Sequence, residues 1–547
     1  MPSDLDITRR YHQRTKHQRS RFARALGYMA WDTQPDPFRV YRGSPRVNLS
    51  LLPPESGPGY EEAMVEGRVT PALLGPASIS RLFQDALGLS AWKQAGGARW
   101  SLRVNPSSGN LHPTEGYLVS GPVEGLSAEA GVWHYQPHDH CLEQRLVLPS
   151  PWWAQVQSQV PAGAVLVGLT SIYVRESWKY GERAFRYCQH DVGHALAALS
   201  IAAAGLGWTT RLLETVMDAD LARLLGISDQ TGPEAEHPDL LLLVFPQGGV
   251  YPRASWQAFR LPELSARDLD WYGAPERLAS EHQPWPVIDE VHQGTTRQEI
   301  PDPTYWATDP TPFSSIKPGD PEISLRSMVH QRRSAVEMDG STGITLREFI
   351  QNVSRVLPGK NQVPFAALPW SARVHLLIFV HRVEGLEPGM YCLVRDLDRL
   401  EFLQTQLYPE GNWSKAKGCP EHFPLYLLAG EDCRYFASSI SCGQAIAADG
   451  AYAMAMLAEF REPLETWGAW FYKRLHWESG VVGQLLYLEA EAIGIRATGI
   501  GCFFDDYTHE VAELTGDGLQ DIYHFTVGGP LEDERLASHP PYEHLKR

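Results

Sequence analysis

The feature that most constrains this chain is an internal repeat. Segments 191–207 and 478–494 align without gaps at an offset of 287 residues, and each predicts a long apolar helix that ends at a glycine. A chain of 547 residues has room for more than one domain, so the repeat indicates two related domains. The alternative is a chance likeness between two buried helices.

Further matched segments flank both helices in the same order. They are acidic amphipathic stretches at 218–226 and 507–516, apolar strand-like runs at 240–245 and 522–527, and strand-turn-strand regions at 116–143 and 373–401 that each contain Val-Glu-Gly-Leu. The shared order favours a true repeat over coincidence. Because strands and hairpins are followed by helices instead of alternating with them, the predicted fold class is α+β.

A proline-rich stretch separates the two halves. Residues 274–321 contain nine prolines and little periodicity, which predicts a long, semi-extended connector. Its length would let the second half swing round to pair with the first. The predicted organisation is an N-terminal leader segment at 1–55, a first domain at 56–273, the linker at 274–321 and a second domain at 322–547.

Charge and cysteine content exclude some classes of function. The formal net charge is −17 and no strongly basic run occurs, which argues against nucleic acid or an anionic membrane surface as a partner. No apolar run of about 18 residues predicts a membrane span, and the polar, arginine-rich start lacks the apolar core of a signal peptide. Seven scattered cysteines without a Cys-x-x-Cys pair favour a reducing cytoplasm.

Three short segments carry candidate binding groups. The turn sequence Pro-Ser-Ser-Gly-Asn at 106–110 exposes backbone N–H groups and short donors. Arg-Arg-Ser at 332–334 offers two guanidiniums and a hydroxyl for a phosphate monoester. The glycines of Thr-Gly-Ile-Gly at 498–501 would let the backbone approach a flat ring closely. Taken alone, the first segment is better explained as a simple loop and the second as a solvated basic turn, and the third has the alternative of a strand entry with turn glycines. No Rossmann glycine motif or P-loop occurs.

Together the three segments resemble the nitroreductase family, and within it the SagB-type dehydrogenase branch. The string Arg-x-x-Pro-Ser-Ser-Gly-Asn-x-His-Pro-x-Glu at 103–115 resembles the family's flavin-contacting loop. His112 stands where simpler nitroreductases usually have glutamine, and SagB-type members resemble the form seen here. Val336 departs from the family pattern, which often has a basic residue at that position. The resemblance covers about 60–265 and 320–535, and the first 50 residues resemble the SagB-type leader.

The resemblance implies two nitroreductase-like domains that form an intramolecular pseudo-dimer, with FMN as the cofactor. In the family, FMN lies at the dimer interface and takes groups from both subunits. The implied cofactor-binding residues are Arg103, Pro106, Ser107, Ser108, Gly109, Asn110, Arg332, Arg333, Ser334, Thr498, Gly499, Ile500 and Gly501.

The motifs are complementary between the halves. Where the serine-rich loop should recur, the second half reads Pro-Phe-Ala-Ala-Leu-Pro-Trp-Ser at 364–371. Where Arg-Arg-Ser should occur, the first half reads Gly-Arg-Val-Thr at 67–70. One interface site would therefore be complete and the other would hold only degenerate pieces, so we expect one FMN per chain.

Lys179 and Tyr180 are the predicted catalytic residues. They resemble the Lys-Tyr pair of the azoline-oxidising SagB branch, which transfers protons beside the flavin. An oxidation that delivers hydride to flavin N5 needs a base for the companion proton, and a desolvated lysine or hydrogen-bonded tyrosine can be tuned to that task. The alternative is a solvated helix start. The equivalent positions of the second half are Thr466 and Trp467.

His190 and His194 are spaced to lie on one helical face, as a metal pair would be. Histidines 134, 138 and 140 and Cys141 lie upstream. The repeat has Trp477 and Val481 at the equivalent positions, and the sequence places no third ligand. We therefore predict no metal site.

The predicted function is that of an FMN-dependent oxidoreductase that oxidises a small molecule or modified peptide by hydride transfer to flavin N5. One alternative is an NAD(P)H-dependent reductase of nitro, quinone or enone compounds. Another is a flavin-free scaffold in a biosynthetic complex. The predicted partners are thus a small-molecule or peptide substrate and, for the reductase, NAD(P)H. The chain would be a monomer with its internal pseudo-dimer, or a homodimer.

Overall fold

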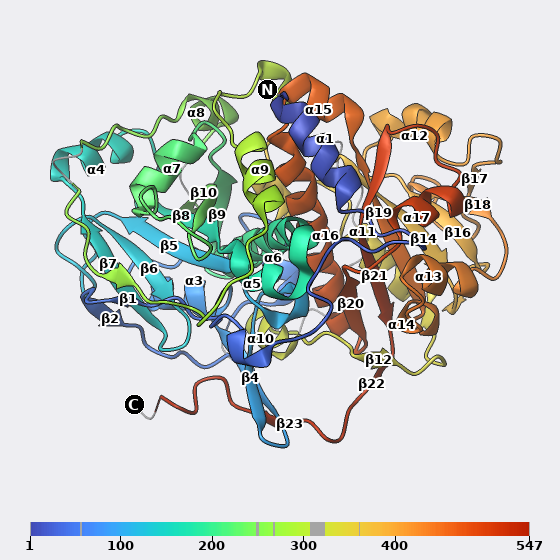
Figure 1. Ribbon diagram of the computed structural model, residues 1–547, viewed down its shortest axis with the longest axis horizontal. Helices are drawn as coiled ribbons and strands as arrows, with labels where there is room; N and C mark the ends of the chain where they lie inside the picture. Colours follow the sequence, from blue (N-terminus) through green and yellow to red (C-terminus); the bar gives the residue numbers. More distant parts are fainter. Residues whose placement is uncertain are drawn as a thin grey trace.

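Two seven-stranded antiparallel sheets form the frame of the protein (Figure 1). The computed structural model describes residues 2–54, 57–247, 251–265, 269–306, 323–359 and 361–545. The first sheet has the order β2 (Arg46–Asn48), β7 (Cys141–Val147), β6 (Gly131–Gln136), β5 (Thr114–Ser120), β8 (Val165–Ser171), β10 (His237–Pro246) and β9 (Trp208–Leu212). The second has the order β17 (Ser414–Lys415), β18 (Leu425–Ala429), β16 (Gly389–Leu393), β14 (Val374–Val380), β19 (Tyr452–Glu459), β21 (Leu519–Gly528) and β20 (Arg496–Ile500).

Side chains of both sheets alternate between a shared central core and a separate outer core. In β8, Val165, Val167 and Leu169 join the central core, whereas Leu166 joins the outer core of the first sheet. The outer cores are closed by α4 (Ser150–Gln157), α7 (Asp218–Leu225) and α8 (Arg253–Ala258) on the first sheet, and by α12 (Leu400–Gln406), α13 (Arg434–Ile440), α14 (Ile446–Asp449) and α17 (Asp505–Val511) on the second. The fold is thus a mixed helix-and-sheet fold, as predicted.

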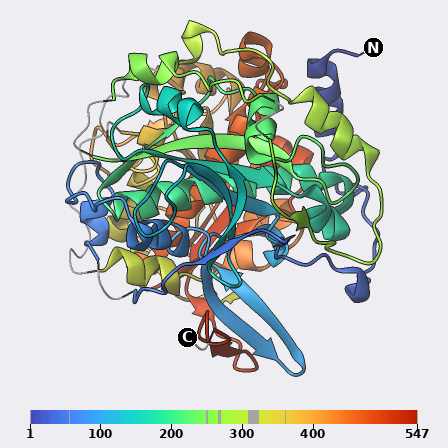
Figure 2. The same cartoon turned by 90° about the vertical axis from the view of Figure 1, so that its left-hand side faces the viewer.

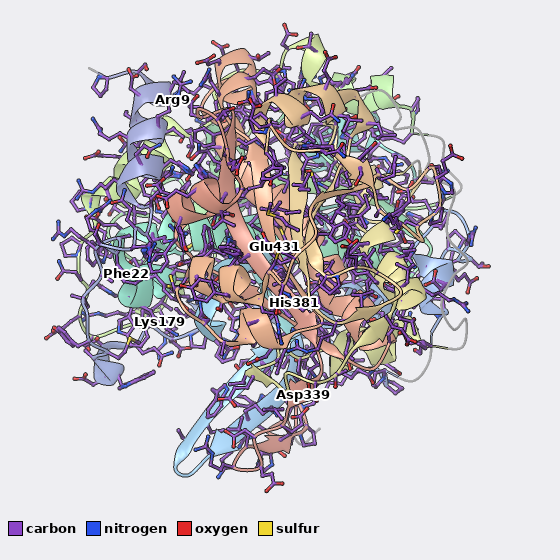
Figure 3. All side chains as sticks on the ribbon, turned by 90° about the vertical axis from the view of Figure 1, so that its right-hand side faces the viewer. Arg9, Phe22, Lys179, Asp339, His381 and Glu431 are labelled. Carbon is purple, nitrogen blue, oxygen red and sulfur yellow. The ribbon has the colours of Figure 1, made fainter. Side chains whose placement is uncertain are left out.

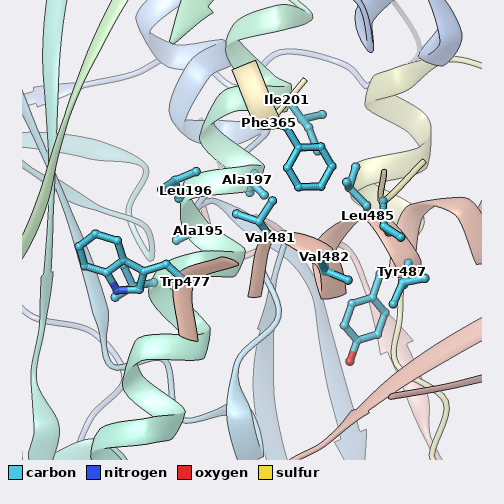
Figure 4. Close-up of a cluster of buried hydrophobic side chains, with 14 of the residues drawn as sticks. Ala195, Leu196, Ala197, Ile201, Phe365, Trp477, Val481, Val482, Leu485 and Tyr487 are labelled. Atoms are coloured by element: carbon cyan, nitrogen blue, oxygen red, sulfur yellow. The ribbon is translucent and has the colours of Figure 1, made fainter. Parts of the chain in front are cut away.

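Two long helices lie between the sheets and confirm the helices predicted from the repeat. They are α6 (Ala184–Ala204) and α16 (Phe471–Ala492), and each is buried over nearly its whole length. Figure 4 shows the apolar contact between them, which includes Ala195, Leu196, Val481 and Val482. Around this pair, α3 (Pro76–Gln84), α10 (Leu325–Gln331) and α11 (Leu346–Ser354) complete the central core.

The two helices cross at a pair of glycines that the repeat also relates. A Cβ atom on Gly480 would lie 2.8 Å from the Cα of Gly193 and 2.8 Å from the His194 nitrogen. A Cβ atom on Gly193 would collide with the backbone of Trp477. Contact between the backbones of the helices therefore requires glycine on both sides.

The linker differs from the prediction, because part of it is helical. Residues 286–294 form α9 (Pro286–Gly294), whose Val287, Ile288 and Val291 are buried, so the prediction of a semi-extended connector is wrong there. Proline at the first helical position favours the start of a helix instead of breaking it. The linker residues 307–321, and the leader boundary at residue 55, lie outside the described residues.

The linker helix repeats the leader helix. Helix α9 packs against α1 (Asp4–Arg14) (Figure 1). The sequence His-Gln-x-Thr occurs at the end of both helices, at 12–15 and 292–295. The hydroxyls of Thr15 and Thr295 donate to the carbonyls four residues earlier, at 2.9 and 2.7 Å. Two residues after each threonine, a backbone N–H donates to an aspartate, at 2.9 Å to Asp505 and at 3.2 Å to Asp218. The two segments therefore share a short sequence and the same local hydrogen bonds.

The C-terminal segment crosses from the second half to the first. Strand β23 (Ala537–His539) pairs with β3 (Leu89–Ala95), which forms a hairpin with β4 (Ala98–Arg103). Figure 2 shows this hairpin projecting below the body of the molecule, beside the C-terminus. The Tyr542 hydroxyl accepts a hydrogen bond from the Leu89 N–H at 2.9 Å and fixes the end of the segment.

Shorter elements complete the described part of the chain. Three two-stranded ladders join β1 (Tyr41–Arg42) with β11 (Ala274–Pro275), β12 (Glu337–Met338) with β22 (Pro530–Leu531), and β13 (Ile344–Thr345) with β15 (Val383–Glu384). The remaining α-helices are α2 (Tyr60–Ala63), α5 (Tyr173–Tyr180) and α15 (Arg461–Trp467). None of the described helices has both the length and the apolar character that crossing a membrane requires.

Candidate functional site

A cavity of about 470 Å³ lies where the two halves meet, and the predicted cofactor-binding residues gather in its wall. From the first half come Arg103, Pro106, Ser107, Ser108, Gly109 and Asn110, and from the second come Arg332, Arg333, Ser334, Thr498, Gly499, Ile500 and Gly501. Segments almost 400 residues apart in sequence therefore share one cavity. The structure brings these residues together, while their roles in binding stay predictions.

The serine-rich loop is held in a tight turn against α6. Gly109, Asn110 and His112 all have a left-handed backbone, with φ of 59°, 61° and 51°. The backbone N–H of Ser108 donates to the Asp191 carboxylate at 3.1 Å, and the Ser108 hydroxyl does so at 3.2 Å. Burial raises the pKa of Asp191 to about 7, although the bonds from the serines oppose the rise. An ionisable carboxyl thus lies directly behind the loop.

The Arg-Arg-Ser segment directly follows α10 and brings two crowded cations to the cavity. Arg332 donates to the Arg103 carbonyl at 3.3 Å, and Arg333 donates to the Ser90 carbonyl at 3.0 Å. Burial and then the neighbouring guanidiniums of Arg332 and Arg496 lower the pKa of Arg333 to about 10. Within the described residues, neither guanidinium of the segment forms an ion pair, although the charge of Glu491 acts on both and its carboxylate accepts a hydrogen bond from the Arg333 backbone N–H. Such a cluster of cations favours an anion.

The glycine segment ends β20 and is tied to the Arg-Arg-Ser segment. The Thr498 hydroxyl donates to the Ala335 carbonyl at 2.6 Å, and the Gly499 N–H donates to the Tyr487 hydroxyl at 3.0 Å. A Cβ atom on Gly499 would collide with Tyr523, and one on Gly501 would collide with Tyr187. Close packing of tyrosines is therefore a structural reason for both glycines, beside the predicted approach to a ring.

Lys179 and Tyr180 end α5 and lie against the serine-rich loop. A Cβ atom on Gly109 would lie 2.6 Å from the Tyr180 hydroxyl and 3.1 Å from the Lys179 ammonium nitrogen. Tyr180 lines the cavity, and Lys179, labelled in Figure 3, lies directly behind Gly109. Burial, and to a lesser extent the charge of Glu176, raises the pKa of Tyr180 well above its usual range. The tyrosine therefore stays protonated at neutral pH.

The sequence analysis missed several residues of the cavity wall. They are Lys93, Trp100, Tyr187, Asp191, His194, Gln444, Tyr487, Arg496, Cys502 and Tyr523, together with residues from the C-terminal segment. Tyr187, Asp191 and His194 follow a spacing of four and three residues, which places them on one face of α6. That spacing of polar residues in an apolar helix was an available signal.

His190 and His194 lie among aromatic rings. His190 stacks on Tyr523 with ring centroids 4.2 Å apart, and burial lowers the pKa of His190 well below its usual range. Among the described residues, three possible metal ligands lie within reach of one another at a different location, at His138, Asp139 and His544. The geometry therefore gives His190 a packing role, whereas His194 lines the cavity.

The 287-residue offset between the two halves takes residues of the cavity wall to a second location in the structure, called here the second place. Side chains fill this second place. Arg474 is the counterpart of Tyr187 in the repeat, and it forms an ion pair of 2.8 Å with Glu214, the counterpart of Gly501. Arg297 of the linker pairs with the same carboxylate. Tyr305 of the linker is 1% exposed and packs on the rings of Trp370 and Trp470 at 6.0 and 5.4 Å. Linker residues thus close this second place.

Comparisons with known proteins agree with this architecture. Residues 75–238 match the model of the nitroreductase family. A candidate nitroreductase of Methanocaldococcus jannaschii is 28% identical over 143 residues, which cover 25% of this chain and 68% of that protein. The crystal structure of a candidate nitroreductase from Anabaena variabilis has a TM-score of 0.69 at 22% identity, and the match covers 96% of this chain and 99% of that one.

Residues 75–238 therefore resemble the nitroreductase family, and the whole chain has a nitroreductase-like fold. Proteins of this family typically bind a flavin.

Proposed function

We propose that this protein is an FMN-dependent oxidoreductase that resembles the SagB-type dehydrogenases and oxidises a small molecule or a modified peptide. The observation that carries the proposal is the meeting of all three motifs in one cavity with Lys179 and Tyr180 beside it. The motifs come from both halves, as they come from both subunits of the dimeric relatives that the sequence resembles.

The chemistry of the cavity wall fits a flavin. Buried side-chain atoms of this wall that have no hydrogen-bond partner among the described residues include Arg103 Nε, Asn105 Oδ1, His112 Nδ1 and Arg332 Nε. Buried polar atoms are normally paired, so unpaired atoms around a cavity favour a polar ligand. The wall also offers aromatic rings and a cluster of cations, which suit a flat ring and a phosphate.

Each motif has a distinct proposed role. Arg332, Arg333 and Ser334 would hold the phosphate and the ribityl hydroxyls. The serine-rich loop at 106–110 would contact the polar edge of the ring, and backbone groups of 498–501 would lie against it. We propose a single FMN per chain, because the corresponding place in the other half is filled by Arg297, Arg474 and Tyr305.

The same reasoning gives the chain its proposed organisation as a fused pseudo-dimer. Two sheets of matching strand order enclose helices that cross at equivalent glycines. The leader and linker helices extend the equivalence to the segments that precede each half. One chain would thus supply both members of the pair that a dimeric enzyme builds from two chains.

Lys179 and Tyr180 would manage the proton that leaves the substrate. When bound, FMN supplies a two-electron acceptor at N5. The raised pKa of Tyr180 keeps its hydroxyl protonated, so Tyr180 would donate a hydrogen bond and orient the substrate. Lys179 would then be the group that takes the proton. Because the pair lies against Gly109, the same loop would position both the ring and the base.

The proposal is tested with Lys179→Ala and Tyr180→Phe. Both variants should retain FMN, while flavin reduction by an oxidisable substrate should slow by about 10²–10⁴-fold, the usual contribution of a general acid or base. Lys415→Ala is a matched control. Lys179 lies over the Tyr180 ring at 5.2 Å and Lys415 lies over the Tyr426 ring at 4.3 Å, but Lys415 and Tyr426 lie outside the cavity.

Reduction by NAD(P)H separates the oxidase from the alternatives. That reaction needs no substrate base, so the two variants should change it far less than they change substrate oxidation. Variants that are reduced by substrate as fast as wild type would favour the nitro, quinone or enone reductase. A protein purified without flavin, and unable to bind added FMN, would favour the scaffold.

A further inference from the structure

Two cysteines meet beside the cavity, and one of them lines it. The Sγ atoms of Cys442 and Cys502 lie 2.9 Å apart, although the residues are 60 positions apart in the chain. Cys442 lies in the turn between α13 and α14, and Cys502 follows the glycine segment at the end of β20. Both side chains are half-buried, and Cys502 lines the cavity. A covalent S–S bond is about 2.05 Å long, so a small movement would join the two atoms.

The backbone around the pair is shaped to hold the two thiols together. Cys442 has a left-handed backbone with φ of 56°, which is uncommon for a residue with a side chain and marks local strain. The Gln444 amide donates to the Ser441 carbonyl at 2.7 Å and to the Cys502 carbonyl at 2.9 Å. This one amide therefore clamps the turn that carries Cys442 to the segment that carries Cys502.

The surroundings of Cys502 favour reaction at its sulfur. The hydrogen bond with Cys442 lowers the pKa of Cys502, burial opposes this, and the Arg183 guanidinium lowers it further. A thiol of lowered pKa that reaches an open cavity is typical of reactive cysteines. No group of three metal ligands among the described residues includes either cysteine, so the geometry is that of a dithiol and not of a metal site.

We propose that Cys442 and Cys502 form a reversible disulfide that exchanges an electron pair with the flavin in the same cavity. This inference rests on the proposed function, since it requires bound FMN. In the oxidising direction the two thiols lose two electrons and two protons, one S–S bond forms, and oxidised flavin takes up both electrons and both protons. In the opposite direction reduced flavin returns them, and the S–S bond breaks. Glutathione disulfide could also oxidise the pair by thiol–disulfide exchange, releasing two molecules of glutathione.

The thiol chemistry is tested on the full-length protein without reference to flavin. The protein is equilibrated in buffers of increasing glutathione disulfide to glutathione ratio, alkylated and analysed by mass spectrometry. Cys442 and Cys502 should lose their reactivity together, in a single two-electron transition with an internal disulfide as product. Cys442→Ser should abolish the transition and Cys419→Ser, a matched half-buried cysteine, should preserve it. Thiols that stay reactive at every ratio would overturn the proposal.

The link to the flavin is tested by anaerobic reductive titration of FMN-loaded protein that has first been oxidised. Wild type should take up two electron pairs per flavin, whereas Cys442→Ser should take up one. Cys442 is the variant of choice because it does not line the cavity, so FMN binding should be kept.

The two experiments distinguish the possible failures. Uptake of one pair by wild type, with the disulfide formed, would overturn the exchange but leave the flavin enzyme intact. A protein that forms the disulfide but binds no FMN would overturn the proposed function and the exchange together.

Discussion

Replacing Gly480 by alanine tests the closeness of the two central helices. The added methyl carbon would lie 2.8 Å from the Cα of Gly193, whereas carbon atoms pack best at about 3.5–4.0 Å. The neighbours are backbone atoms of a buried helix and cannot rotate away, so α6 and α16 must separate by about 0.7 Å or more. Overpacking of this kind typically costs about 1–3 kcal/mol, and the better helix propensity of alanine returns about 1 kcal/mol.

Because backbone is involved on both sides, we take an overpacking cost of about 3 kcal/mol, and the helix propensity of alanine offsets about 1 kcal/mol of it. We therefore expect Gly480→Ala to lower the free energy of unfolding by about 2 kcal/mol. The assay is a urea titration followed by circular dichroism. FMN affinity should fall as well, because α6 carries Tyr187 and Asp191 and α16 carries Tyr487, all in the cavity wall.

Gly97→Ala is the matched control. Gly97 lies in the exposed turn of the β3–β4 hairpin, and no atom lies within 4 Å of the added methyl group, so its effect should stay within about 0.5 kcal/mol. A Gly480→Ala protein with the unfolding midpoint and FMN affinity of wild type would refute the backbone contact described here.

Three further outcomes can be measured. Denatured protein should release one FMN per chain, and a ratio near two would show that the second place also binds it. Arg333→Ala should raise the FMN dissociation constant roughly tenfold or more, since a charge-assisted bond contributes about 1.5–3 kcal/mol; an unchanged constant would make the segment a plain turn. Between an unfolded pKa of about 3.9 and the folded value of about 7, the folded state keeps the Asp191 proton that the unfolded state loses. Stability should therefore fall as pH rises through this window and level off above it, and Asp191→Asn should reduce the slope of urea midpoints against pH; equal slopes would contradict the burial argument.

The repeat made the central part of the fold predictable. Two buried helices whose backbones touch need small residues at the crossing. The alignment without gaps pairs Gly193 with Gly480, the two residues at that crossing. The candidate binding motifs could be recognised in the sequence for a similar reason, because tight backbone turns and paired cations restrict which residue types can occur at a position. Arg332 and Ser108 thus line one cavity as the motifs predicted.

Features that depend on distant contacts were not predictable from the same patterns. The leader and linker helices share little sequence beyond His-Gln-x-Thr. The prolines around α9 led to the prediction of a semi-extended connector instead of a helix. The pairing of β23 with β3 joins segments more than 400 residues apart, and nothing local in either strand names its partner. The proximity of Cys442 and Cys502 likewise arises only when the turn before α14 packs beside β20.

The filled second place has a consequence for how this protein can change over time. In an assembly of two identical chains, every substitution enters both interface sites, so a residue that blocks one site blocks the other. Here Tyr187 and Arg474 are encoded separately, and so are Gly501 and Glu214. In the proposed pseudo-dimer, substitutions can therefore fill one location with ion pairs and linker aromatics while the other location stays open. Substitutions at Tyr305 can therefore change stability without altering the cavity wall, which Tyr305 does not line.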